Sequence, residues 1–345
     1  MSLYAFIGTY TQIGSDGIYV CRVDPITGAF TQIASAKTAN PTFLALHPNR
    51  RFLYAANELD ADTAAVTAYA LHTKTPNTAT LTELNQQPTH ASAPCHVMVD
   101  ATGHWLIAAN YGNGDLCVYP ILNDGTLGKL TDRVQQTGGS PHGHSVTMDA
   151  TNQFAFACDL GLDRVFVYRL DLEHGALLPH GETKLAAGAG PRHFAFHPGG
   201  KYAYVINELN STVTAFAYDA AHGALRELQT LSTLPIGFTE TNYCADVHVH
   251  PSGKFLYGSN RGHNSLAIFA IDDGTGLLSP IGHEPTGGDW PRNFALPPNS
   301  NWLYAANQNS DSIVQFEVNA MSGALKPTGH IFNVPKPVCI QFLAL

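Results

Sequence analysis

The sequence predicts an all-β fold, a seven-bladed β-propeller with four antiparallel strands in each blade. One repeating unit dominates the chain, and its second strand ends at Asn or Asp every 47 to 53 residues. A repeat of about 50 residues that contains four short strands is typical of propeller blades. Four clear copies begin at Pro41, Pro94, Pro191 and Pro291, and two variants begin at His144 and Ala245.

The two ends of the chain supply the seventh blade. Segments that match a second, a third and a fourth strand lie at Tyr4–Tyr10, Ile18–Val23 and Gly28–Ala34. A lone first strand matches Pro337–Leu343. We therefore expect the N- and C-terminal strands to pair within one blade and close the ring, which removes the sheet edges that an open array would expose. The whole chain, residues 1–345, is then a single domain.

Most of the conspicuous residues in the repeat are predicted to be structural. The aromatic residues of each second strand alternate with a period of two, so they should pack between blades. His47, His197 and His250 precede turn prolines at equivalent repeat positions, and we expect them to support those turns. The glycines that begin the segments GAF, GTL, GAL and GLL should end hairpins rather than bind phosphate; they are Gly28, Gly125, Gly175, Gly223, Gly276 and Gly323. The six cysteines are scattered without a Cys-x-x-Cys pair, which predicts free thiols.

Composition and charge narrow the range of partners. Lys and Arg number 18 against 27 Asp and Glu, a formal net charge of −9, which argues against nucleic acid and anionic membranes. The chain contains no apolar stretch long enough to span a bilayer, and its N-terminus lacks the features of a signal peptide. We therefore expect a cytoplasmic protein. Because no coiled-coil pattern is present, we expect a monomer or a loose homodimer.

Strand order predicts which side chains ring one mouth of the central channel. In a propeller the first strand is innermost, and antiparallel pairing places its start beside the end of the second strand. Charged residues at these two positions come from several blades: His144, Arg192, Glu208, Arg261 and Arg292. Because the planar guanidinium fork binds carboxylate and phosphate, this mouth is predicted to be an anion site. The alternative is that Arg192 and Glu208 form only a structural ion pair.

A second set of polar residues lies one position further along the first strands. It consists of His96, His193 and Asp246, which we expect to contact the substrate. The long connection Leu231–Cys244 crosses the same face, and long loops beside a predicted site are usually functional.

Four segments carry a family resemblance: GAGPRHFAFHP from Gly188, YAYVINELNSTV from Tyr202, HGHSV from His142 and CADVHVHPSGKFLYGSNR from Cys244. With the repeat, they resemble the seven-bladed propeller lactonases over essentially the whole chain. That family contains bacterial propeller-type 6-phosphogluconolactonases and fungal carboxymuconate lactonizing enzymes. In it, a His, an Arg, a Glu and a further Arg surround the lactone-binding mouth. The resemblance implies that these catalytic groups are here His144, Arg192, Glu208 and Arg261.

The choice of the imidazole leaves an alternative open. His142 lies two residues before His144 and is the second candidate for the same role, with an expected substrate contact. The pair could instead be half of a metal site, but the sequence holds no companion pair at ligand spacing. We therefore predict neither a metal nor another cofactor.

The resulting functional hypothesis is hydrolysis of a sugar-acid lactone, with 6-phospho-D-glucono-1,5-lactone as the expected small anionic substrate. His144 or Glu208 would act as general base on water, Arg192 and Arg261 would bind the developing charge, and Arg292 would contact the phosphate. Two alternatives remain. The same site could run related lactone or muconate cycloisomerase chemistry on another carboxylate. The propeller could also be a non-enzymatic scaffold for protein partners, since the fold alone proves no chemistry.

Overall fold

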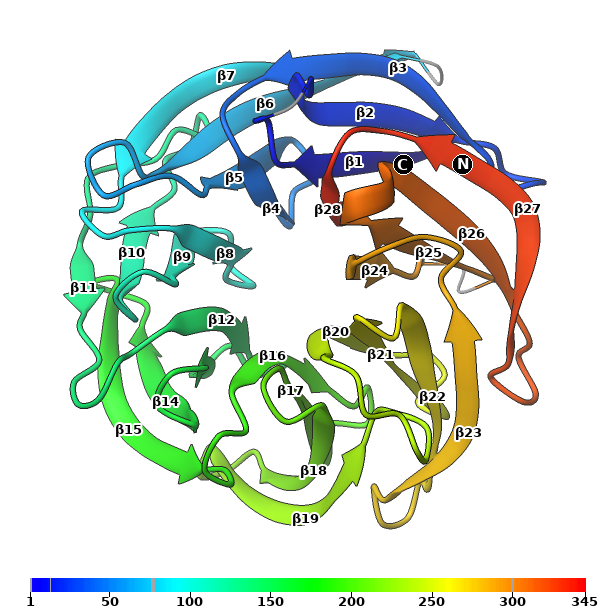
Figure 1. Cartoon of the computed structure of the whole chain (residues 1–345). Coiled ribbons are helices and arrows are strands. Elements are labelled where there is room, and N and C mark those ends of the chain that lie inside the picture. Colours follow the sequence, from blue (N-terminus) through cyan, green and yellow to red (C-terminus); the bar gives the residue numbers. More distant parts are fainter. Residues whose placement is uncertain (1, 13, 76–77, 299–300) are drawn as a thin grey trace.

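The computed structural model describes residues 2–12, 14–75, 78–298 and 301–345. These residues form seven four-stranded antiparallel sheets arranged in a ring (Figure 1). In every blade, the strand that matches the predicted first strand is innermost. The seven-bladed fold predicted from the repeat is therefore confirmed.

The strands of each blade follow, from the innermost to the outermost. The blades are β28 (Pro337–Ala344), β1 (Leu3–Thr9), β2 (Gly17–Val23) and β3 (Phe30–Lys37); β4 (Pro41–Leu46), β5 (Phe52–Asn57), β6 (Ala65–Thr75) and β7 (Thr78–Pro88); β8 (Pro94–Val99), β9 (Trp105–Asn110), β10 (Leu116–Pro120) and β11 (Asp132–Val134); β12 (Gly143–Met148), β13 (Phe154–Asp159), β14 (Arg164–Asp171) and β15 (Ala176–Lys184); β16 (Pro191–Phe196), β17 (Tyr202–Asn207), β18 (Thr212–Asp219) and β19 (Ala224–Ser232); β20 (Tyr243–Val249), β21 (Phe255–Arg261), β22 (Ser265–Ile271) and β23 (Leu278–Pro285); and β24 (Pro291–Ala295), β25 (Trp302–Asn307), β26 (Ser312–Val318) and β27 (Leu325–Asn333). A short 3-10 helix, Gln308–Ser310, follows β25.

The two ends of the chain close the ring as predicted. β28 pairs antiparallel with β1, and Phe6 lies opposite Gln341 in this pairing. The outer strand of the same blade begins at Phe30, two residues later than the predicted start at Gly28. The difference arises because Gly28 has a left-handed φ of 73° and forms part of the hairpin that precedes the strand.

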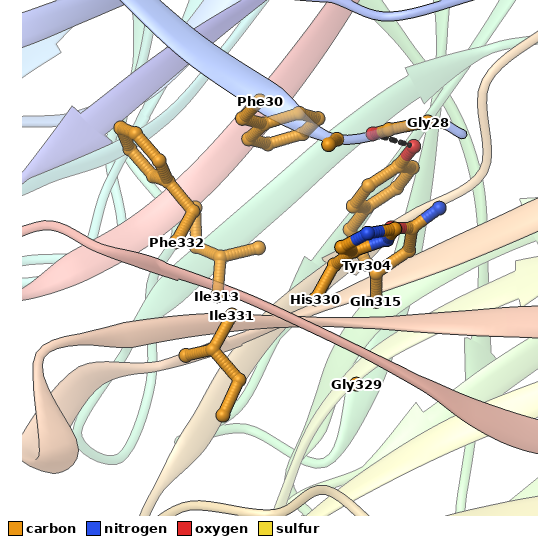
Figure 2. A pocket seen from close by; sticks show the side chains of 10 residues that line it. Gly28, Phe30, Tyr304, Ile313, Gln315, Gly329, His330, Ile331 and Phe332 are labelled. Atoms are coloured by element: carbon orange, nitrogen blue, oxygen red, sulfur yellow. Dashed lines mark hydrogen bonds between the residues drawn. The ribbon is translucent and has the colours of Figure 1, made fainter. Parts of the chain in front are cut away.

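Six hairpins between third and fourth strands pack through a glycine against the neighbouring blade: those at Gly28, Gly125, Gly175, Gly223, Gly276 and Gly323. The hydroxyl of Tyr304 on β25 donates a hydrogen bond of 2.7 Å to the carbonyl of Gly28, which lies in the neighbouring blade formed by β28 and β1 to β3 (Figure 2). Tyr54 in the blade of β4 to β7 donates in the same way to Gly125 in the blade of β8 to β11, at 3.1 Å. The glycine also packs closely against an aromatic ring. A Cβ at Gly28 would come within 2.8 Å of the ring of Trp302. These repeated contacts explain why the sequence keeps both the glycine and the aromatic side chains.

Replacing Gly175 with Ala should therefore lower the free energy of unfolding by about 2 to 4 kcal/mol. Gly175 has a φ of 64°, and an added Cβ would overlap the ring of Trp105 on the neighbouring blade. The matched control is Gly181→Ala in β15, where an added Cβ has no atom within 4 Å. Chemical denaturation should show a large loss for the first variant and little change for the second. Equal stability of the two variants would contradict this account of the hairpins.

The remaining structural expectations are largely confirmed. His47 and His197 each place Nε2 at hydrogen-bond distance from a carbonyl of the next blade, Gly103 and Gly253 respectively, at 2.9 and 3.0 Å. All six cysteines are free and buried. Among the described residues, no helix has the length and apolar character needed to cross a bilayer.

Candidate active site

A β-bulge at the start of the innermost strand displaces the rim residue from the strand ladder. In the pairing of β16 with β17 the register shifts between Pro191 and His193, which leaves Arg192 as the extra residue. The same shift leaves out His144 in β12 and Arg292 in β24. A bulge frees its extra residue from regular pairing and re-aims the side chain. The rim positions predicted on the first strands are therefore bulge positions at His144, Arg192 and Arg292.

Two buried guanidinium groups from neighbouring blades meet on one carboxylate oxygen. Arg192 on β16 donates from Nε to Oε2 of Glu208 over 2.8 Å, and its side chain is 2% exposed. Arg261, the last residue of β21, places Nη2 2.7 Å from the same oxygen and is 4% exposed. Backbone carbonyls hold both groups, because Arg192 donates to Ala245 and Arg261 to Cys244. The predicted Arg192–Glu208 pair exists, but a second blade contributes to it.

The charges in this group depend on one another. Burial raises the pKa of the Glu208 carboxyl, but Arg192, Arg261 and Arg292 outweigh this effect and bring the pKa below its usual value. Burial and the neighbouring Arg192 lower the pKa of Arg261, whereas Glu208 opposes that shift. Arginine stays protonated in proteins, so the group carries an ionised carboxylate between two cations at neutral pH. Removing the carboxylate would leave two buried cations uncompensated.

The predicted imidazole lies on the next blade. His144 is buried, and burial, Arg192 and the other nearby cations hold its pKa well below the usual value, so it is neutral at neutral pH. Its Nδ1 lies 3.8 Å from Sγ of Cys95. The ring of Tyr111 stacks on His142 at 4.5 Å between centroids and meets His144 edge-on at 5.7 Å. The two candidate histidines thus contact the same tyrosine, and His142 is also within 2.7 Å of its carbonyl oxygen.

The other side of the mouth holds a cation that Glu58 and Glu208 stabilise only at longer range. Arg292 is half-buried and makes no hydrogen bond or ion pair to the described residues, although its guanidinium lies 5.6 Å from the ring centre of Tyr10. The Tyr10 hydroxyl donates to Oε1 of Glu58 over 2.7 Å. Oε2 of Glu58 is buried without a hydrogen-bond partner in the described part of the chain. An unpaired donor and an unpaired acceptor therefore lie on this side of the rim.

A layer of rings lies beneath the rim. Phe43 and His96 lie 4.1 Å apart between ring centroids, His96 and His193 5.7 Å, and His193 and His144 5.4 Å. His193 also lies 2.7 Å from Oδ1 of Asp246. Phe43 and His96 line a hollow of about 640 Å³ toward the far ends of the inner strands. His96, His193 and Asp246 are thus one layer below Arg192, and their contact with a substrate stays a prediction.

The structure adds residues that the sequence did not single out as site residues. Glu58 and Tyr111 directly follow the last residue of a second strand, the repeat position that also carries Glu208. Tyr10 follows the second strand of the closing blade in the same way. The repeat position therefore connects these residues with Glu208 in the sequence. The type of residue at that position differs between blades, and so residue type alone does not single them out.

A separate cavity of about 220 Å³ lies between the closing blade and its neighbour, away from the mouth. Figure 2 shows its lining, which includes Phe30, Ile313, His330 and Phe332. Its polar groups are engaged in joining the two blades, since Gln315 donates to the Thr27 carbonyl over 2.8 Å. None of its lining residues belongs to the mouth. Among the described residues, no three His, Cys, Asp or Glu side chains gather as a metal site would require.

The fold and the mouth together define a class of protein, a seven-bladed propeller with arginines from several blades gathered at one end of its ring. The chain belongs to the seven-bladed β-propeller lactonase family, whose model matches residues 4–342. The resemblance seen in the sequence is therefore confirmed. The family description covers the fold and the lactonase class, and the assignment of roles to individual residues stays a prediction.

Named relatives are similar over most of their length. The chain is 36% identical over 346 residues to the 6-phosphogluconolactonase of Bacillus subtilis, covering 98% of this chain and 97% of that protein. It is 33% identical over 308 residues to the 6-phosphogluconolactonase of Formosa agariphila, covering 84% and 85%. The solved structure of a periplasmic gluconolactonase from Pseudomonas aeruginosa matches with a TM-score of 0.93 and 32% identity over 99% of both chains. Because that protein is periplasmic, a cytoplasmic location for this chain stays a prediction.

Proposed function

We propose that this protein hydrolyses 6-phospho-D-glucono-1,5-lactone to 6-phosphogluconate. The names of the relatives from Bacillus subtilis and Formosa agariphila support this substrate. The observation that carries the proposal is Arg292, a half-buried guanidinium that makes no hydrogen bond or ion pair to the described residues, beside the Arg192–Glu208–Arg261 group. Because buried charges are normally paired, an open cation at this place suits an anionic ligand such as a phosphate.

Hydrolysis adds one water molecule across the ester bond of the lactone. A water attacks the lactone carbonyl while a general base takes its proton, a step that typically contributes about 10²- to 10⁴-fold. Glu208 and His144 are both in the protonation state that accepts a proton at neutral pH, because the carboxylate is ionised and the imidazole is neutral. The tetrahedral oxyanion then collapses and breaks the bond to the ring oxygen. That oxygen takes up a proton, and the product is the open hydroxy acid.

The arginines would divide the negative charges of the substrate between them. Nη2 of Arg192 and Nη1 of Arg261 make no hydrogen bond to the described residues, so each remains a donor for the oxyanion. Loss of one such donor typically costs about 10²- to 10³-fold in rate. Arg292 would bind the phosphate, and the free oxygen of Glu58 would accept from a sugar hydroxyl.

A second substrate is favoured by one observation. The Pseudomonas aeruginosa structure is described as a gluconolactonase, and it covers the whole fold with a TM-score of 0.93. The unphosphorylated lactone would use the same base and oxyanion donors, and it would leave Arg292 without a phosphate to bind.

Steady-state rates with freshly generated 6-phosphogluconolactone and with glucono-1,5-lactone, corrected for spontaneous opening, distinguish the two substrates. We expect a higher kcat/KM for the phosphorylated lactone. Arg292→Met should lower kcat/KM for that lactone by about tenfold more than for the other, because it removes the phosphate contact. The control is Arg226→Met, at an exposed arginine on β19. Equal losses on both lactones, or a wild-type preference for the unphosphorylated one, would contradict the proposal.

A further inference from the structure

A buried hydrogen-bonded network leads from the mouth toward the far ends of the inner strands. Nη1 of Arg192 lies 3.2 Å from Nε2 of His193, whose Nδ1 lies 2.7 Å from Oδ1 of Asp246. Oδ2 of Asp246 then lies 3.0 Å from Nε2 of His248. The side chain of His248 is 40% exposed, and it lines a hollow of about 270 Å³ on the side opposite the mouth.

The chemistry of its neighbours fixes where the proton of His193 lies. A guanidinium can only donate, so Nε2 of His193 must accept from Arg192. The proton of the neutral ring is then on Nδ1, where it is donated to the carboxylate of Asp246. Burial and the charge on Arg192 lower the pKa of His193 to about 4, so the neutral ring is the form present near neutrality.

Asp246 is held in place by several further donors. Oδ1 also accepts from the amide of Val247 at 2.9 Å, and Oδ2 accepts from the side-chain amide of Asn293 at 2.6 Å. Its side chain is 4% exposed. Both ring nitrogens of His193 and both oxygens of Asp246 are thus engaged by protein groups, which leaves neither residue a free polar atom for a ligand.

We propose that His193 and Asp246 are positioning residues for Arg192 and do not themselves contact the substrate. Asp246, held by His248 and Asn293, keeps His193 in the tautomer that accepts from Nη1 of Arg192. The hydrogen bonds to His193 and to the Ala245 carbonyl fix Nη1 of Arg192, and the hydrogen bond to Glu208 fixes Nε. Nη2 is then left to donate to the oxyanion of the lactone. This inference rests on the proposed function, because Arg192 is the group that the network serves.

A double-mutant cycle tests whether the network acts through Arg192. Asp246→Asn should lower kcat/KM by about tenfold or more in the wild-type background. An amide donor at position 246 favours the His193 tautomer protonated on Nε2, and that N–H would then face the N–H of Arg192, so that two donors meet. In the Arg192→Lys background the same change should cost about threefold or less, since the group being positioned is already altered. Equal losses in both backgrounds would overturn the proposal and indicate a general structural effect.

Two variants of His193 add a comparison within one position. Gln carries one acceptor and one donor at the end of its side chain, so His193→Gln can still accept from Arg192 and donate to Asp246. His193→Phe fills the space and can do neither. We expect the Gln variant to retain about tenfold more kcat/KM than the Phe variant at similar thermal stability. Equal activity of the two variants would overturn the positioning role.

The tautomer can also be observed without any activity measurement. In ¹⁵N-histidine NMR of the full-length protein, with His193→Gln used to assign the signal, His193 should show a protonated Nδ1 and a bare Nε2. In Asp246→Asn the pattern should reverse. A wild-type ring protonated on Nε2 would overturn the network. If the NMR result holds but the wild-type protein does not accelerate lactone hydrolysis, the proposed function fails and the network remains. If the wild type is active and Arg192→Lys matches it, the positioning role fails and the proposed function remains, so the two failures are distinguishable.

Discussion

Glu208→Gln is expected to lower kcat/KM for the lactone by about 100-fold or more. The carboxylate of Glu208 accepts from Arg192 and lies 2.7 Å from Nη2 of Arg261, and a neutral amide can compensate neither cation. The change therefore removes a candidate base and also disturbs both oxyanion donors. The control is Glu182→Gln, which breaks an exposed carboxylate–arginine pair with Arg164 on outer strands. The control should keep wild-type activity.

The pH dependence of the wild type and of Glu208→Gln separates the effect of the charge at position 208 from the effect of side-chain shape. Because the pKa of Glu208 lies below its usual value, the ionised form persists in the wild type as the pH falls, and kcat/KM should decline only below the pH range in which an ordinary glutamate titrates. Stability follows the same sign. Because the folded pKa lies below the unfolded one, the contribution of Glu208 is complete above the unfolded pKa and is lost as pH falls through the folded pKa. Glu208→Gln should lack both of these acid-dependent losses.

His144→Gln, measured in the same way, assigns the base. If Glu208 takes the proton, the acid decline should persist in His144→Gln and disappear in Glu208→Gln. Wild-type turnover in a folded Glu208→Gln protein would remove this carboxylate from the mechanism.

Arg192→Lys should also lower kcat/KM by about 100-fold, although the positive charge is kept. The guanidinium of Arg192 contacts Glu208, the Ala245 carbonyl and His193 at the same time, and a single ammonium group cannot reproduce that planar arrangement. The loss should appear mainly in kcat, because the donor acts on charge that develops during the reaction. Arg164→Lys, in the exposed pair on β14, serves as the control for an Arg-to-Lys change. Activity of the Arg192 variant within threefold of wild type would contradict this role.

The repeat explains why so much of the fold and rim could be predicted. Each unit carries the same strand order, so the position of Arg192 in one blade predicts those of His144 and Arg292 in others. The terminal segments fit the same pattern, and this allowed the pairing of β1 with β28 to be predicted. Closure of a ring leaves few arrangements for a chain with six internal units and two complementary ends.

Side-chain partners could not be predicted in the same way. For example, Arg261 and Arg192 both contact Oε2 of Glu208. This contact depends on the spacing between neighbouring blades and on the bulge at Arg192, and the alternating pattern of apolar and polar residues along a strand reveals neither. The hydrogen bonds of His193 could not be predicted either, because one nitrogen contacts Asp246, far away in the sequence, and the other contacts the adjacent bulged Arg192. Strand order gives the layer in which a residue lies and leaves its hydrogen bonds open.

A crystal structure of the protein with bound 6-phosphogluconate tests the central claim most directly. The product carboxylate should lie within hydrogen-bond distance of Arg192 or Arg261, with the phosphate on Arg292. Product bound in the hollow beside His248, in the cavity of Figure 2, or elsewhere outside the rim would contradict it.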